Sequence, residues 1–174
     1  MMALFERFIQ IFFGLLFLYA SLGKFRGLRN FRMQLLQFPM IPHSFSGAVA
    51  TLVPAAELVI GCMLLLGFKS RIAAILGECM FMIFTFIIVW TIISKRKVAC
   101  FCFGENDGTI SWMTFFRNLF LIVLLAPCLF MNHSAEVGII ANAIFLPIYG
   151  LAGMLLFLSI FHLAAQHREV YAKI

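Results

Sequence analysis

The sequence has very little charge. Only 11% of its 174 residues are charged and 64% are hydrophobic, with a mean hydropathy of +1.06. A chain of this composition cannot bury its apolar surface in one water-soluble core. The scarcity of charge therefore excludes a soluble globular domain and predicts a single all-α integral membrane domain over residues 1–174 in the lipid bilayer, placed in the cell membrane with several passes.

Acidic residues are the scarcer charged type, with seven Asp and Glu against 13 Lys and Arg and a net charge of +6. The basic residues cluster just outside apolar runs, where membrane topology and anionic headgroups account for them. This placement argues against nucleic acid as a partner. The sequence also lacks a small-residue cleavage site after Leu22, so we expect the first apolar helix to be retained.

Long apolar runs predict about five membrane spans, each near the roughly 20 residues that a bilayer requires. The segment between the first two spans, residues 24–44, alternates basic and apolar residues at helical spacing, which is typical of an amphipathic segment in the membrane interface. The expected spans are residues 8–23 with short extensions at both ends, then 45–68, 71–94, 112–131 and 137–163.

The sequence lacks the two-to-four-residue cysteine spacing of structural zinc sites, and its four histidines are scattered, so no metal site is predicted. It does contain Cys100 and Cys102, separated by one residue. Two thiols this close can form a disulfide only through a small, strained ring, and strained disulfides are exchange-prone. The pair therefore indicates redox chemistry, and the alternative is two ordinary thiols at a helix end.

The other cysteines, Cys62, Cys79 and Cys128, all lie inside predicted spans. Buried thiols in apolar surroundings usually behave as inert small hydrophobes. We expect that behaviour for these three.

Two acids, Glu57 and Glu78, also lie within predicted spans, where an ionisable group is costly. The expected partners are Lys24 and Arg117, and we predict an ion pair between Glu57 and Arg117. Two interpretations stay open: a structural pair that fixes helix register, or a site that handles protons or binds a ligand.

The orientation in the membrane is ambiguous. Ten basic residues fall on the side that holds residues 95–111, against three on the other side, and the positive-inside rule then places Cys100 and Cys102 in the cytoplasm. Disulfides, however, persist mainly outside the cytosol. We favour the extracytoplasmic placement on chemical grounds.

The order of motifs resembles the MauE branch of the MauE/DoxX family. The resemblance covers roughly residues 16–125 and rests on the joint order of the motifs rather than on any one of them. The motifs are Gly23-Lys24-Phe25, the stretch 38–42, Pro54 to Glu57 followed by Gly61 and residues 64–67, Cys-x-Cys-Phe-Gly at 100–104, Ser111-Trp112 and Arg117-Asn118.

The resemblance implies a small helical bundle with a four-helix DoxX-like core, a redox role and a thioredoxin-like partner, in a family named from methylamine utilisation. Cys100 and Cys102 would form the catalytic pair, with Glu57, Arg117 and Asn118 as polar residues for a cofactor. The first hypothesis is a membrane thiol-disulfide relay, in effect a thiol-disulfide oxidoreductase, that supports maturation of an extracytoplasmic protein. The alternative is a non-catalytic binding or assembly module that holds a quinone-like or lipid ligand. A transporter is disfavoured because no internal repeat is visible.

Overall fold

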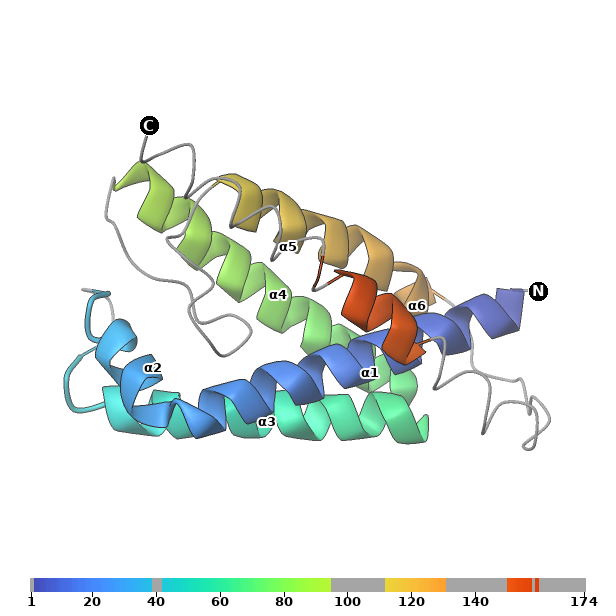
Figure 1. Ribbon diagram of the computed structural model, residues 1–174, viewed down its shortest axis with the longest axis horizontal. Helices are drawn as coiled ribbons and strands as arrows, with labels where there is room; N and C mark the ends of the chain where they lie inside the picture. The colour runs from blue at the N-terminus through green and yellow to red at the C-terminus, as the bar shows by residue number, and fades with distance from the viewer. Residues whose placement is uncertain (1, 39–41, 95–111, 131–149, 158, 160–174) are drawn as a thin grey trace.

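The computed structural model describes residues 2–38, 42–94, 112–130, 150–157 and 159. The helices are α1 (Met2–Arg26), α2 (Leu28–Leu35), α3 (Ser46–Leu66), α4 (Ser70–Ile93), α5 (Trp112–Leu125) and α6 (Pro127–Phe130). Residues 150–157 are also helical. The predicted all-α fold is confirmed for these parts of the chain, as Figure 1 shows.

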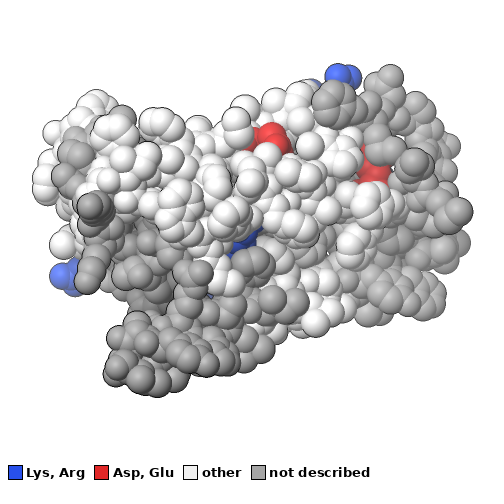
Figure 2. Space-filling view, turned by 90° about the horizontal axis from the view of Figure 1, so that it is seen from above, with Lys and Arg blue, Asp and Glu red and all other residues white. Residues whose placement is uncertain are grey.

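Among the residues that the structure describes, four helices are long and apolar enough to cross a membrane: Phe5–Arg26, Ser46–Leu66, Ser70–Ile93 and Trp112–Leu129. They correspond to the first four predicted spans. Most of the predicted fifth span lies outside the described residues. Among the described residues on the face in Figure 2, charged side chains are few and isolated, as lipid contact requires, and the chain is a multi-pass membrane protein.

The bundle consists of two helix pairs, with α1 packed along α3 and α4 packed along α5 (Figure 1). A tight turn joins α3 to α4, and Gly67 adopts a left-handed φ of 67° to close α3. Because the helices alternate in direction, one end of the bundle gathers α2, the last turns of α1 and α4, and the first turns of α3 and α5. We call this end the α2 end.

The predicted interfacial segment is a helix only in part. Its first residues, including Lys24, belong to α1, and α2 begins at Leu28. α2 is amphipathic, because Phe31 and Leu35 pack against Ala50 of α3 while Arg29 and Arg32 are exposed. This pattern fits the position in the membrane interface expected from the sequence.

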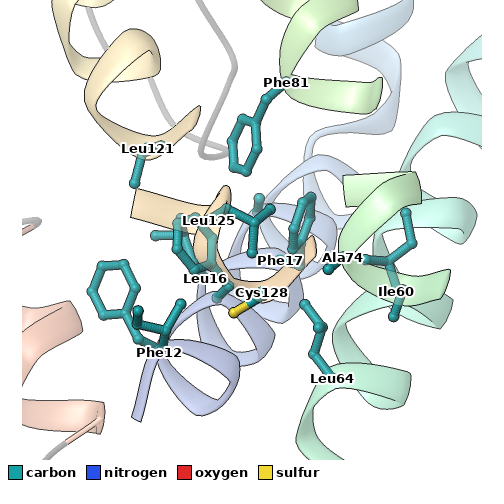
Figure 3. Close-up of a cluster of buried hydrophobic side chains, with 14 of the residues drawn as sticks. Phe12, Leu16, Phe17, Ile60, Leu64, Ala74, Phe81, Leu121, Leu125 and Cys128 are labelled. Atoms are coloured by element: carbon teal, nitrogen blue, oxygen red, sulfur yellow. The ribbon is translucent and has the colours of Figure 1, made fainter. Parts of the chain in front are cut away.

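The hydrophobic core is centred on α1. In the span formed by α1, 56% of residues are buried, against 28–33% in the other three spans, so α1 is the helix that the others surround. Aromatic rings of α1 and α4 meet edge to face, with the Phe13 and Phe81 centroids 5.9 Å apart. Figure 3 shows core side chains that converge from five helices: Phe12, Leu16, Phe17, Ile60, Leu64, Ala74, Phe81, Leu121, Leu125 and Cys128.

Two glycines allow α1 and α3 to touch through their backbones. A Cβ atom at Gly61 would lie 3.0 Å from the carbonyl oxygen of Gly14, and a Cβ atom at Gly14 would lie 3.1 Å from that of Gly61. Small residues at membrane helix interfaces permit this close approach, since lipid tails provide no hydrophobic drive to bring the helices together. The contact fixes how close the polar groups on the two helices can come.

We predict that Gly61→Val separates α1 from α3 and lowers stability by about 1–3 kcal/mol, the usual cost of overpacking. The measurement is reversible unfolding in detergent. Ala56→Val is the control, because Ala56 is exposed on the same helix and should tolerate the same side chain. Equal effects of the two substitutions would refute the close contact.

Candidate functional site within the helical bundle

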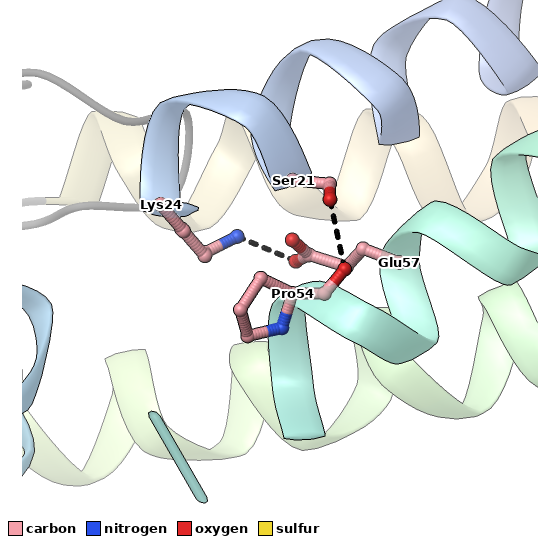
Figure 4. A network of polar contacts seen from close by, with 4 residues as sticks. All are labelled: Ser21, Lys24, Pro54 and Glu57. Carbon is pink, nitrogen blue, oxygen red and sulfur yellow. Dashed lines mark hydrogen bonds and ion pairs between the residues drawn. The ribbon is translucent and has the colours of Figure 1, made fainter. Parts of the chain in front are cut away.

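A buried ion pair joins the two most closely packed helices. The side chains of Lys24 and Glu57 are 1% and 2% exposed, and Lys24 Nζ lies 2.5 Å from Glu57 Oε1 (Figure 4). The Lys24 ammonium also lies over the ring of Phe84 of α4, 5.3 Å from its centroid, and 5.9 Å from that of Phe31 of α2. Four helices therefore enclose this one charge.

A second polar contact lies one turn away. Ser21 Oγ donates a hydrogen bond of 2.8 Å to the carbonyl oxygen of Pro54, which Figure 4 shows beside the ion pair. Ser21 precedes Lys24 by three residues, and Pro54 precedes Glu57 by three, so both contacts follow one face of each helix. Pro54 has no backbone N–H and so leaves one carbonyl of α3 without its usual intrahelical donor. The two contacts together fix the register of α1 against α3.

Arg117 and Asn118 are both buried in the first half of α5. Asn118 Nδ2 donates a hydrogen bond of 3.2 Å to Thr85 Oγ1 of α4, and the Thr85 hydroxyl donates in turn to the carbonyl oxygen of Phe81. This contact links the second helix pair much as the ion pair links the first.

Glu57 and Asn118 line one small cavity between the helix pairs, about 20 Å³ in volume. The other described residues that line it are apolar and come from α1 and α4: Leu16, Phe17, Ala20, Phe81 and Phe84. The predicted cofactor role of Glu57, Arg117 and Asn118 stays a prediction, and the cavity itself has the volume of about one water molecule. Arg117 is not among the residues that line the cavity.

The predicted ion pair between Glu57 and Arg117 is wrong, because the partner of Glu57 is Lys24. The reason lies in the packing: Lys24 is on α1, the helix that contacts α3 most extensively, whereas Arg117 is on α5, which packs on α4. Glu78 is half-buried on α4, and no described residue forms an ion pair with it.

Cys100 and Cys102 lie outside the described residues. Among the other cysteines, Cys128 is buried in the core, as expected (Figure 3), but Cys62 and Cys79 are exposed on α3 and α4. The expectation of burial is therefore wrong for those two. A thiol is small and weakly polar, so a lipid-facing position accepts it as readily as the core does.

Sequence reasoning did not single out Ser21 and Thr85, which support the charged and amide groups. The available signals were that Ser21 lies one turn before Lys24 and that Thr85 is a hydroxyl residue in the middle of a mostly apolar span. Such residues are common in membrane helices, and only the packing shows which of them meet a partner.

A larger groove lies away from the polar groups. It has a volume of about 450 Å³ and is lined by apolar residues of α1, α5 and the helical segment 150–157: Phe8, Ile9, Phe12, Phe120, Leu124, Gly153, Leu156 and Phe157. Its size and lining suit a hydrocarbon chain.

These features define a class: a polytopic α-helical membrane protein whose apolar bundle encloses a paired lysine and glutamate. The family model for methylamine utilisation protein MauE matches residues 2–131, and the chain belongs to this family.

Two curated relatives share this description. Methylamine utilization protein MauE of Paracoccus denitrificans is 27% identical over 118 residues, which cover 67% of this chain and 63% of the relative. The protein of the same name from Paracoccus versutus is 28% identical over 157 residues, 84% of each chain. The chain thus matches somewhat less than two thirds of the first relative's length. No solved structure matches the chain.

We predict that Glu57→Gln lowers stability by about 3–5 kcal/mol, because it leaves the Lys24 ammonium buried without a counter-charge. The double substitution Lys24→Met with Glu57→Met should recover most of this loss, since an apolar pair of similar volume avoids the desolvation cost. The measurement is a double-mutant cycle of unfolding in detergent.

The control is Glu78→Gln, which neutralises a half-buried acid that has no ion-pair partner among the described residues. Its effect should be small. Additive losses from the Lys24 and Glu57 substitutions, or equal losses at Glu57 and Glu78, would contradict the pairing.

Proposed function

We propose that this protein is a membrane thiol-disulfide relay that supports disulfide formation or maturation of an extracytoplasmic protein, with a thioredoxin-fold partner. Cys100 and Cys102 carry the chemistry. A thiolate of one protein attacks the disulfide of the other, a mixed disulfide forms, and the second thiol resolves it. One dithiol is oxidised as one disulfide is reduced, so electrons and protons balance. The relatives are named for methylamine utilisation, which supports a role of the proposed relay in that process.

The observation that carries the proposal is the uneven distribution of buried polar groups. Apart from Gln10 and Ser70, the buried polar residues in the described part of the chain lie in the middle of the bundle or toward the α2 end. They are Ser21, Lys24, Gln34, Ser46, Glu57, Thr91, Thr114, Arg117 and Asn118. The chain that contains Cys100 and Cys102 leaves α4 and enters α5 at this same end. The polar half of the scaffold is thus the half to which the cysteine segment is attached.

The proposed orientation places this end outside the cytoplasm. Lys24 and Arg117 are buried, so neither contributes a charge at the headgroups, although removing both from the count leaves the basic bias in the same direction. The proposal rests on the compartment in which disulfides persist.

A second function is favoured by the apolar groove. A lipid chain held against α1 and α5 would make the protein a non-catalytic binding or assembly module, with the ligand in the groove rather than beside Glu57. In that case the cysteines would be dispensable.

The relay predicts that Cys100→Ser or Cys102→Ser leaves one thiol able to trap a mixed disulfide with a thioredoxin-fold partner in cells. The measurement is non-reducing electrophoresis of the purified protein, with mass spectrometry of the trapped partner. Cys62→Ser, Cys79→Ser and Cys128→Ser are the controls and should behave like the parent. Full function without trapping in both single variants would leave the binding module as the better account.

Labelling tests on which side of the membrane the cysteines lie. After reduction, a membrane-impermeant maleimide should label Cys100 and Cys102 of the parent protein in intact cells, and the remaining one of the two in each single variant. Labelling that occurs only after the membrane is broken would reverse the proposed orientation.

A further inference from the structure

The geometry points to a buried water-binding site between Glu57 and Asn118, where the four spanning helices meet. The cavity that these two residues line has a volume of about 20 Å³. A water molecule needs about 10–15 Å³ and two to four polar partners. The cavity is therefore large enough for one water and too small for an organic ligand.

The polar partners come from two helices, Glu57 from α3 and Asn118 from α5. Glu57 Oε1 accepts the contact from Lys24, and no described residue donates a hydrogen bond to the buried Oε2 atom. Asn118 gives one amide hydrogen to Thr85, which leaves its amide oxygen and its second amide hydrogen. One water can donate a hydrogen bond to Glu57 Oε2. It can form a second hydrogen bond with the Asn118 amide, as donor to the oxygen or as acceptor from the N–H. Without the water, Glu57 Oε2 would be a buried acceptor with no donor, which costs desolvation free energy. The water removes this cost.

The charges around the cavity select water over an ion. The negative charge of Glu57 is already neutralised by Lys24, so the cavity offers no net charge to hold a second cation. An anion would face the carboxylate directly. Among the described lining residues, the aromatic side chains of Phe17, Phe81 and Phe84 supply no further donors or ligands. A neutral molecule that both donates and accepts hydrogen bonds fits these constraints.

The water completes a polar chain across the bundle. It runs from Lys24 of α1 to Glu57 of α3, through the water to Asn118 of α5, and on to Thr85 of α4. Otherwise the contact between the two helix pairs is largely apolar. The inference concerns the bundle alone and stands whether or not the cysteines act as a relay.

The test fills the cavity without changing either polar residue. Ala20 is 4% exposed and lines the cavity, so Ala20→Val should displace the water and lower the Tm, because Glu57 Oε2 loses its donor. In a Lys24→Met and Glu57→Met background the same substitution should leave the Tm unchanged or raise it, because no buried carboxylate remains. Ala56→Val, on the exposed face of α3, is the control for the added volume.

An equal loss of Tm in both backgrounds would show simple overpacking and would overturn the proposal. A higher Tm of Ala20→Val in the parent background would also overturn it. Should Ala20→Val fail to fold, an experimental structure of the parent protein that resolves ordered waters decides the matter. Density within hydrogen-bond distance of both Glu57 and Asn118 supports the site, and an empty cavity overturns it.

Discussion

The bundle depends on a constraint set by one buried ion pair. Removing Lys24 and Glu57 from water is costly, and their mutual attraction repays that cost only when the two groups meet. A shift of α1 along α3 by one turn would leave both charges buried and apart. The pair therefore specifies the register of these helices, and the contact between Gly14 and Gly61 brings the helices close enough for the pair to form.

An apolar pair of similar volume often matches a buried ion pair in stability, so stability alone does not account for the charges. Their position gives a further reason. The ion pair, the Ser21 contact and the Asn118 amide all lie between the middle of the bundle and the α2 end, to which the cysteine segment is attached. The groove at α1 and α5 lies apart from them and offers only hydrocarbon contacts. The two regions thus differ in character. The polar region fixes the register of the helices, and the groove can hold a lipid chain.

The spans were predictable because each is a long apolar run, and the first four predicted ranges agree with the helices to within a few residues. The placement of Lys24 was not predictable in the same way. The basic residues that follow Lys24 led to its prediction in the interfacial segment. In the structure α1 continues to Arg26, so Lys24 is part of α1 and lies inside the bundle.

The choice of Lys24 over Arg117 as the partner of Glu57 also required the structure, as did the outward position of Cys62 and Cys79. Both depend on which helices touch, and α3 and α4 are apolar on all sides, so their sequences contain little information about the inward face. In the sequence, Gly61 stands out only as part of a motif. Its role as a backbone contact with Gly14 depends on the packing of two helices that are far apart in the sequence.

The central claim is that Lys24 and Glu57 are paired in the membrane, and solid-state NMR in lipid bilayers tests it most directly. With isotope labels on the lysine ammonium and the glutamate carboxylate, the account predicts a strong dipolar coupling between Lys24 Nζ and the Glu57 carboxyl carbon, lost in Lys24→Met. Absence of that coupling in the parent protein, or a coupling from Glu57 to Arg117 in its place, would contradict it.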